Sequence, residues 1–342
     1  MKPYERVFAA INLEEPDKVP VIPQITYTTA RLIGIKFSEA MRNANALARA
    51  LIAGYTSFGY DGVYVGWESS FNVLAEAMGC KLREHDDSLP SVSEPLIKDE
   101  SDLGRMKVPN PQTDGRLPIH LEALKIVNER VGREAAILSW TPGPLTFAGI
   151  LRGTEKLLVD LLTNRKFVHE ILKVATSSSV QFALAKLDAG AQIIAVADPT
   201  ASSSVISPKA FEEFSYPYLS VILSSIRKHG GTPSLHICGN TVPILERMSE
   251  TGAEIFELDS IVDLATAKRT VGRKVCLQGN IDTTRMLMGS PSEVFTQARK
   301  CIEAAGEGGG FILSSGCEIP LDAPHQNVQS MIEAARRYGG YG

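Results

Sequence analysis

The chain alternates between short, mostly hydrophobic runs and longer stretches in which hydrophobic residues recur every three or four positions. A short apolar run predicts a buried β-strand, whereas the three- and four-residue spacing predicts a helix with one buried face. The pattern predicts eight strands, at residues 18–25, 62–66, 135–140, 192–197, 233–238, 254–258, 274–279 and 310–315. The first of these contains two prolines and should be irregular, because proline cannot donate a backbone hydrogen bond.

Helices are predicted between these strands and near both ends of the chain. They cover residues 3–14, 38–58, 119–131, 154–189, 207–229, 242–251, 263–271, 291–305 and 325–337. Glycine often stands just before the next strand, as at Gly190 and Gly252, where it suits the C-terminal cap of a helix. The regular alternation of strand and helix indicates an α/β fold.

The strand count predicts a (β/α)8 TIM barrel that forms a single domain over residues 1–342. A doubly wound open sheet is the alternative for the same alternation. Residues 3–14 form an N-terminal helical extension in this prediction. The polar, proline-containing residues around 80–118 are read as an insertion, with a hairpin over residues 81–97.

Composition and charge narrow the range of possible functions. Hydrophobic residues make up 44% of the 342 positions, which is enough for a large core. The net charge is −4 and no run of lysine and arginine occurs, which argues against nucleic acid and membrane partners. Neither a signal peptide nor a long apolar span is evident. We therefore expect a cytoplasmic protein whose five cysteines are free thiols or metal ligands.

Candidate metal ligands gather at the carboxyl ends of the predicted strands, where a barrel carries its active site. His236 and Cys238 end one strand, and side chains two residues apart point to the same face of a strand. Cys317 follows the last strand, so barrel closure brings it to the same mouth. One imidazole and two thiolates with an open fourth position are typical of a catalytic zinc site. Without Cys317, the His-x-Cys pair would be read as packing.

Three other polar residues at strand ends are candidates for catalysis. Asp198 is a partner of the metal ligands, a substrate contact or only the cap of its loop, and Glu68 and Asn280 rank after it. The other cysteines are expected to be small buried residues: Cys80, Cys276 and Cys301. Four histidines on polar or helical stretches are expected at the surface: His85, His120, His169 and His229.

Several segments of the chain resemble the uroporphyrinogen decarboxylase superfamily, whose members are (β/α)8 barrels. They are Gly143-Pro-Leu-Thr-Phe-Ala148, Asp188-Ala-Gly-Ala-Gln192 with Asp198-Pro, Leu235-His-Ile-Cys-Gly-Asn240 and Leu277-Gln-Gly-Asn-Ile-Asp282. The resemblance runs nearly end to end. His236, Cys238 and Cys317 match the residues that hold zinc in the cobalamin-dependent methyltransferase branch. Enzymes of that branch pass a methyl group between a corrinoid protein and a thiol such as coenzyme M.

The resemblance implies a zinc ion that activates a small-molecule thiol, and methylcobalamin carried by a separate corrinoid protein. The chain has no Asp-x-His-x-x-Gly cobalamin-binding motif, so the corrinoid should come from that partner. A docking surface for the partner is expected around the barrel mouth, where the insertion around 80–118 can contribute.

Other functions stay open on the sequence alone. The same zinc could serve a small methyl donor, such as a methyl ether or an alcohol, that feeds the corrinoid instead. A uroporphyrinogen decarboxylase is disfavoured, because the Arg-Gln-Ala-Gly-Arg segment of true decarboxylases is replaced by residues 23–29 and Arg31 is the nearest arginine. A third reading is a metal-free barrel that binds a small molecule without turnover.

Overall fold

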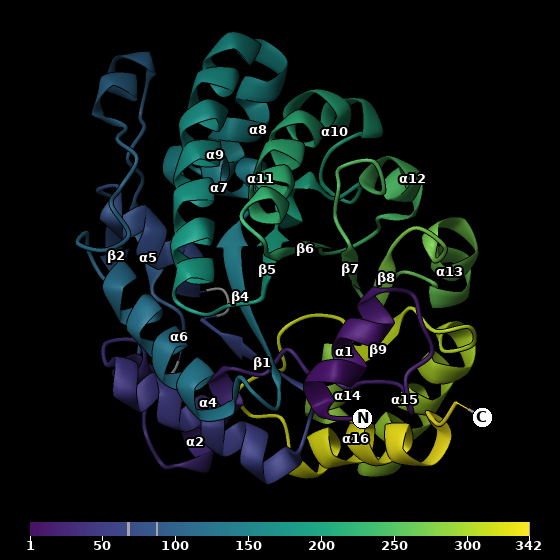
Figure 1. Cartoon of the computed structure of the whole chain (residues 1–342). Helices are drawn as coiled ribbons and strands as arrows, with labels where there is room; N and C mark the ends of the chain where they lie inside the picture. Colours follow the sequence, from purple (N-terminus) through teal and green to yellow (C-terminus); the bar gives the residue numbers. More distant parts are fainter. Residues whose placement is uncertain (67–68, 87, 342) are drawn as a thin grey trace.

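The computed structural model describes residues 1–66, 69–86 and 88–341, and it contains a sheet of seven parallel strands (Figure 1). In spatial order these strands are β1 (Gly62–Val65), β4 (Ala136–Pro142), β5 (Ile193–Ala197), β6 (Thr232–Ile237), β7 (Ile255–Leu258), β8 (Cys276–Ile281) and β9 (Phe311–Ser315). The spatial order follows the chain order, as the consecutive β–α units of a barrel require. Each strand agrees with a predicted one to within a few residues.

The proline-containing segment 18–25 lies between β9 and β1 and takes the place of the eighth strand; we call each such element of the barrel wall a stave. Leu313 on β9 accepts a hydrogen bond from the Ile22 amide at 3.0 Å and donates to the Pro20 carbonyl at 2.9 Å. On the other side, the Asp61 amide just before β1 donates to the Val21 carbonyl at 2.7 Å. Because prolines remove two donors, only isolated bridges form instead of a regular strand. The predicted barrel and its irregular first strand are confirmed.

Sixteen α-helices occur in the described residues. They are α1 (Pro3–Ile11), α2 (Tyr27–Leu32), α3 (Phe37–Ala40), α4 (Ala44–Phe58), α5 (Ser69–Ala77), α6 (Leu117–Val131), α7 (Pro144–Arg152), α8 (Thr154–Thr163), α9 (Arg165–Asp188), α10 (Pro208–Phe214), α11 (Tyr216–Lys228), α12 (Leu245–Met248), α13 (Leu264–Val271), α14 (Thr283–Met288), α15 (Pro291–Ala305) and α16 (His325–Tyr338). No helix in the described part of the chain is long and apolar enough to cross a membrane.

Three helices predicted as continuous are broken. The Asn43 side chain accepts a hydrogen bond from the Ala46 amide and so starts α4 separately from α3. Asn164 caps α9 in the same way and separates it from α8. Pro217 lies in the first turn of α11, where a backbone amide has no partner within the helix and can be absent. The same proline cannot continue the preceding helix, so α10 ends before it. The sequence pattern overlooked these breaks because the apolar spacing continues across them.

The insertion around 80–118 contains the predicted hairpin. Strands β2 (Lys81–Arg83) and β3 (Ser91–Glu94) pair antiparallel, and a short 3-10 helix, η1 (Glu100–Arg105), follows. Figure 1 shows this hairpin standing apart from the barrel, next to α5. Its side chains are mostly exposed or half-buried, so it adds little to the core.

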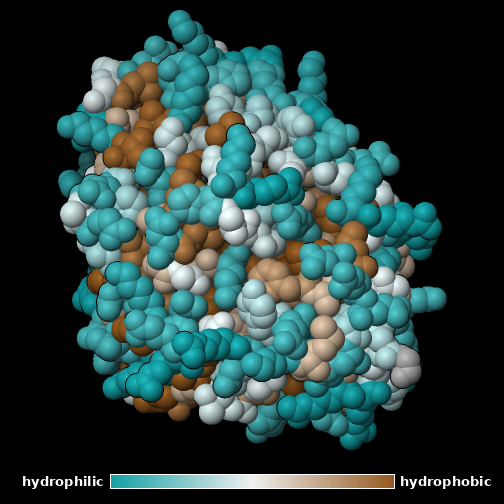
Figure 2. All heavy atoms as spheres, viewed as in Figure 1, coloured by the Kyte–Doolittle hydropathy of each residue, from teal (hydrophilic) through white to brown (hydrophobic). Residues whose placement is uncertain are grey.

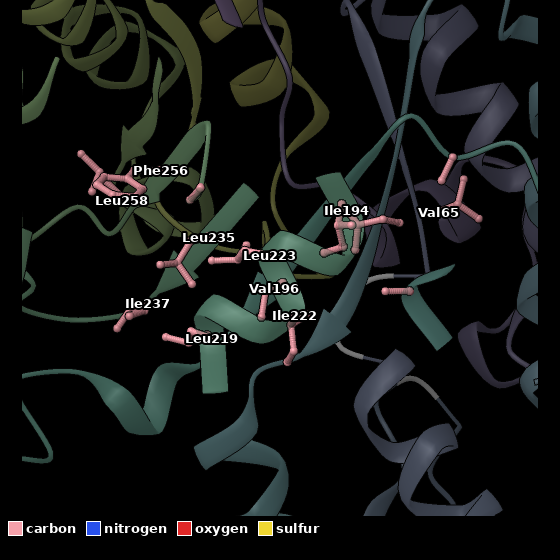
Figure 3. Close-up of a cluster of buried hydrophobic side chains, with 14 of the residues drawn as sticks. Val65, Ile194, Val196, Leu219, Ile222, Leu223, Leu235, Ile237, Phe256 and Leu258 are labelled. Carbon is pink, nitrogen blue, oxygen red and sulfur yellow. The ribbon is translucent and has the colours of Figure 1, made fainter. Parts of the chain in front are cut away.

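The alternation of side chains along each strand separates an outer core from the barrel interior. Figure 3 shows Leu235 and Ile237 of β6 on the side of α11, close to Leu219, Ile222 and Leu223. Residues between them, at 234 and 236, therefore point into the barrel. Covering helices thus fix the direction of the polar side chains that form the site.

Helix α1 (purple in Figure 1) closes the amino-terminal end of the barrel. Its Val7, Ala10 and Ile11 pack in the interior cluster with Cys276 and other residues of the strands. The Tyr4 amide also donates to the carbonyl of Glu134, directly before β4, at 2.8 Å.

A buried ion pair ties α1 to the irregular stave. Arg6 Nη1 lies 2.5 Å from Asp61 Oδ1, and both residues are at most 6% exposed. Asp61 Oδ2 accepts a hydrogen bond from the Val21 amide at 2.7 Å. One carboxylate therefore satisfies both a buried guanidinium and the backbone of the closing segment. Its pKa is raised by burial, although the Val21 amide and Arg6 oppose the shift.

Replacement of Asp61 by asparagine should destabilise the fold, because it leaves the buried Arg6 charge without its buried partner. We expect the Asp61→Asn variant to lose about 3 kcal/mol of unfolding free energy in urea denaturation. Asp17→Asn is the matched control: Asp17 also pairs with Arg6, but its side chain is 39% exposed. It should lose at most about 1 kcal/mol. Equal losses in the two variants would contradict this account of barrel closure.

Candidate functional site

Three candidate ligands converge at the carboxyl end of the barrel. His236 lies on β6, Cys238 follows β6, and Cys317 follows β9. His236 Nε2 is 2.9 Å from Cys238 Sγ, and the two sulfur atoms are 3.9 Å apart. Their ligand atoms all lie within 4.8 Å of one another. Strands β6 and β9 are not neighbours, so only the curvature of the barrel brings the third residue to the other two.

The His236 ring is held in a fixed orientation. Its Nδ1 lies 3.0 Å from the Glu257 carbonyl oxygen on β7, and its ring stands edge-on to Trp140, with centroids 5.7 Å apart. A carbonyl can only accept, so Nδ1 carries a hydrogen, and Nε2 is the nitrogen that faces the Cys238 sulfur. A second ring nitrogen that donates to a carbonyl is the usual arrangement for a histidine that binds metal.

Gly239 makes the sharp turn that places Cys238. Its φ is +77°, and a Cβ there would lie 2.8 Å from both Ser202 Oγ and Ser204 Oγ. The Gly239 amide donates to Asp259 Oδ2 at 2.7 Å, and the Asn240 amide donates to Ser204 Oγ at 3.0 Å. The loops after β5 and β7 therefore brace the loop that carries the cysteine.

The donor set fits a soft divalent cation. The pKa of the Cys317 thiol is raised well above its ordinary value, because it hydrogen-bonds to Cys238 and is largely buried. The Cys317 thiol therefore resists ionisation unless a cation compensates its charge. One nitrogen and two sulfur ligands at this spacing match the preference of zinc.

Glu257 is a buried carboxyl group that the sequence analysis did not single out. It is 1% exposed and accepts hydrogen bonds from Ser234 Oγ at 2.6 Å and from Gln24 Nε2 at 2.9 Å. The Tyr64 hydroxyl contacts it as well. Burial raises the pKa of this carboxyl group. An acidic residue inside a strand expected to be buried on both faces was the signal in the sequence.

The three predicted catalytic residues have different surroundings. Asp198 is fully buried and accepts hydrogen bonds from the Thr146 amide at 2.6 Å and the Leu145 amide at 3.3 Å, so it caps α7. Burial raises the pKa of Asp198 to about 6. Asn280 Nδ2 donates to the carbonyls of Asp259 and Val262 and holds the loop after β7. Glu68 lies outside the described residues.

The other cysteines and histidines agree with the sequence prediction except in one case. All five cysteines are free, and Cys80, Cys276 and Cys301 are buried as expected. The prediction for His120 was wrong: it is fully buried beside Phe182. Burial lowers the pKa of its imidazole to about 3, so it packs as a neutral ring. The sequence placed it at the surface because it lies on a helical stretch away from the strand ends, but it falls on the buried face of α6.

Comparison with known proteins gives full-length matches. The Uroporphyrinogen decarboxylase (URO-D) family profile matches residues 2–338. A Methylcobamide:CoM methyltransferase MtbA of Methanosarcina acetivorans is 31% identical, and the match covers 98% of each chain. A Methylcobamide:CoM methyltransferase MtaA of Methanosarcina barkeri is 30% identical over 97% of each chain. A solved structure described as a methyltransferase from Methanosarcina mazei superposes with a TM-score of 0.90 at 29% identity, over 99% of both chains.

The predicted ligand set can be tested by metal content. The Cys317→Ala variant should lose bound zinc, because one imidazole and one thiolate hold the ion far more weakly than three ligands. Cys276→Ala is the matched control, since Cys276 is a buried thiol near the barrel floor. Protein purified under reducing conditions should contain about one zinc per chain in the wild type and in this control. Zinc retained in Cys317→Ala, or lost equally from both variants, would refute the assignment.

Proposed function

The chain belongs to the uroporphyrinogen decarboxylase family, and from that premise we propose that it transfers a methyl group between a corrinoid protein and a thiol. The observation that carries the proposal is the convergence of His236, Cys238 and Cys317 at the barrel mouth. Methyltransferases that match the full chain support it, and two of them are named for a methylcobamide and coenzyme M.

Zinc is the metal we propose for this site, with His236, Cys238 and Cys317 as its ligands. When bound, zinc supplies an open coordination position that lowers the pKa of a substrate thiol. The Glu257 carbonyl keeps the imidazole in the tautomer that binds metal. The brace around Gly239 limits movement of Cys238, so the ligands are arranged before the substrate arrives.

The thiol sulfur is the nucleophile in the proposed reaction. Its proton leaves to solvent, a carbon–sulfur bond forms at the methyl group, and the carbon–cobalt bond breaks with its electron pair left on cobalt. The corrinoid belongs to the partner protein and is a substrate of this chain. The barrel therefore has to hold the thiol in line with a methyl group that approaches from outside the mouth.

We propose supporting roles for the remaining candidates. Asp198 holds the first turn of α7 at the mouth, and Asn280 holds the loop whose Asp259 braces Gly239. Both would act by positioning rather than by contact with the methyl group. Glu68 follows β1 in the sequence and remains a proposed substrate contact.

The alternatives differ in what the mouth would need. A porphyrinogen carries many carboxylates and requires cations, but the segment after the first stave has only Arg31, which pairs with Asp322 at 2.7 Å. In the second alternative the same three ligands would hold the metal, but the methyl group would pass from a small donor to the corrinoid. Two sulfur ligands favour a thiol over an oxygen-bearing donor.

Methyl transfer can be followed by the absorbance of the corrinoid. Zinc-loaded protein mixed with methylcobalamin and a panel of thiols should convert the methylated corrinoid to the demethylated form. The Cys317→Ala variant should be slower by at least about a hundredfold, whereas Cys276→Ala should retain the wild-type rate. Decarboxylation of a porphyrinogen without demethylation by any thiol would overturn the proposal.

A further inference from the structure

Three large hydrophobic side chains are exposed in the segments that follow β5, β6 and β7 at the barrel mouth. Val205, Val242 and Ile261 are 48%, 43% and 66% exposed, respectively, and we call these three residues the rim patch. Their strands are neighbours in the sheet, so the rim patch lies along one side of the mouth. Cys238 is on the same side, because it follows β6.

Ile261 is tied to the turn that follows Cys238. Asp259 Oδ2 accepts a hydrogen bond from the Gly239 amide at 2.7 Å, and Asp259 Oδ1 accepts one from the Ile261 amide at 3.1 Å. One carboxylate therefore joins the residue after the candidate metal ligand to the backbone of the rim patch. Both of its oxygens are engaged within these loops.

Val242 and Val205 are tied to the same turn through Asn240. The Asn240 side-chain oxygen accepts a hydrogen bond from the Val242 amide at 3.1 Å. The Asn240 amide donates at 3.0 Å to Oγ of Ser204, which directly precedes Val205. The rim patch is therefore held beside the metal ligands by contacts within the mouth itself.

The exposed polar residues beside the rim patch are uncharged. They are Ser204, Asn240 and Ser260. Charged residues come next along the chain, at the starts of the helices that follow: Lys209, Glu246 and Asp263. Next to Cys238 the mouth thus exposes apolar side chains together with neutral hydroxyl and amide groups. A ligand that fits this surface is itself largely apolar, with neutral hydrogen-bonding groups.

The opposite side of the mouth carries ion pairs instead. Arg31 and Asp322, from the segments after the first stave and β9, lie 2.7 Å apart. Lys36 and Asp86 pair at 2.7 Å where the hairpin region meets the segment after α2. Figure 1 shows the hairpin and helices α12 and α13 on opposite sides of the barrel. Covering these charges with a neutral ligand would remove their water, which is unfavourable.

From these observations we propose that the corrin ring of the methyl donor lies against the rim patch while its methyl group faces the thiol. A corrin ring has apolar faces with methyl substituents and uncharged carboxamide groups along its edge, which match the apolar and neutral groups of this surface. The inference rests on the methyl-transfer function proposed above and names the side of the mouth that receives the corrinoid. The insertion around 80–118 lies on the other side, away from the ring.

A carboxylate placed in the rim patch provides the test. In Val242→Asp and Ile261→Asp the ring would have to cover a charge, so the KM for methylcobalamin at saturating thiol should rise about tenfold. Val108→Asp is the matched control, because Val108 lies in the insertion and is 42% exposed, against 43% for Val242. It should keep the wild-type KM. An unchanged KM in both rim variants, or an equal rise in Val108→Asp, would overturn the inference.

Thiol binding shows whether a rim variant has damaged the metal site itself. The protein is loaded with Co²⁺ in place of zinc and titrated with 2-mercaptoethanol, a neutral thiol, and the sulfur-to-cobalt absorbance reports binding without methyl transfer. Val242→Asp and Ile261→Asp should bind this thiol as the wild type does, because the rim patch supplies no metal ligand. A loss of thiol binding that parallels the rise in KM would contradict a role in holding the corrin ring.

Cyanocobalamin separates this inference from the function it rests on, because it has the same corrin ring but no methyl group to transfer. Its binding is measured by equilibrium dialysis. Weaker binding to the rim variants than to Val108→Asp, without demethylation of methylcobalamin by any thiol, would refute methyl transfer and support the corrin surface. Demethylation with the wild-type KM in both rim variants would refute the surface and leave methyl transfer standing. Wild-type protein that binds no cyanocobalamin would refute the surface.

Discussion

Closure of the barrel through residues 18–25 is the constraint on which the rest of the structure depends. Prolines prevent this segment from forming a regular strand, so it is held by a few backbone bonds to β9 and β1 and by the Asp61 carboxylate. Only a closed barrel brings the end of β9 to the end of β6. The distance between Cys317 and Cys238 therefore depends on a contact made far from either cysteine, next to the buried Arg6.

The two faces of each strand have different roles: outward side chains pack in the core, and inward side chains form the site. On β6, Leu235 and Ile237 pack against α11, and their burial directs His236 into the barrel. Polar residues in the interior form hydrogen bonds with one another, as Glu257 does with Ser234 and Gln24. Hydrophobic surface elsewhere is divided into separate patches among hydrophilic residues on the face in Figure 2.

Much of the architecture could be predicted from the local sequence pattern. The strands are short apolar runs, and their outward side chains have to be buried by helices. The triad His236, Cys238 and Cys317 could be predicted for the same reason, since the ends of parallel strands meet at one edge. Helix breaks at Asn43 and Asn164 could not, because a side-chain cap depends on one hydrogen bond and leaves the apolar spacing intact. The burial of His120 and the network around Glu257 depend on neighbours that are distant in sequence.

Helix α1 has a kinetic consequence for the proposed reaction. Because it plugs the amino-terminal end of the barrel, both substrates have to arrive through the carboxyl-terminal end. A small thiol and a corrinoid mounted on a protein cannot pass each other at one entrance. In the proposed reaction the thiol would enter first and the partner would then cover it, and the methylated product would leave after the partner. A helix packed at the amino-terminal end of the barrel would thereby set the order of binding in the proposed reaction at the opposite end.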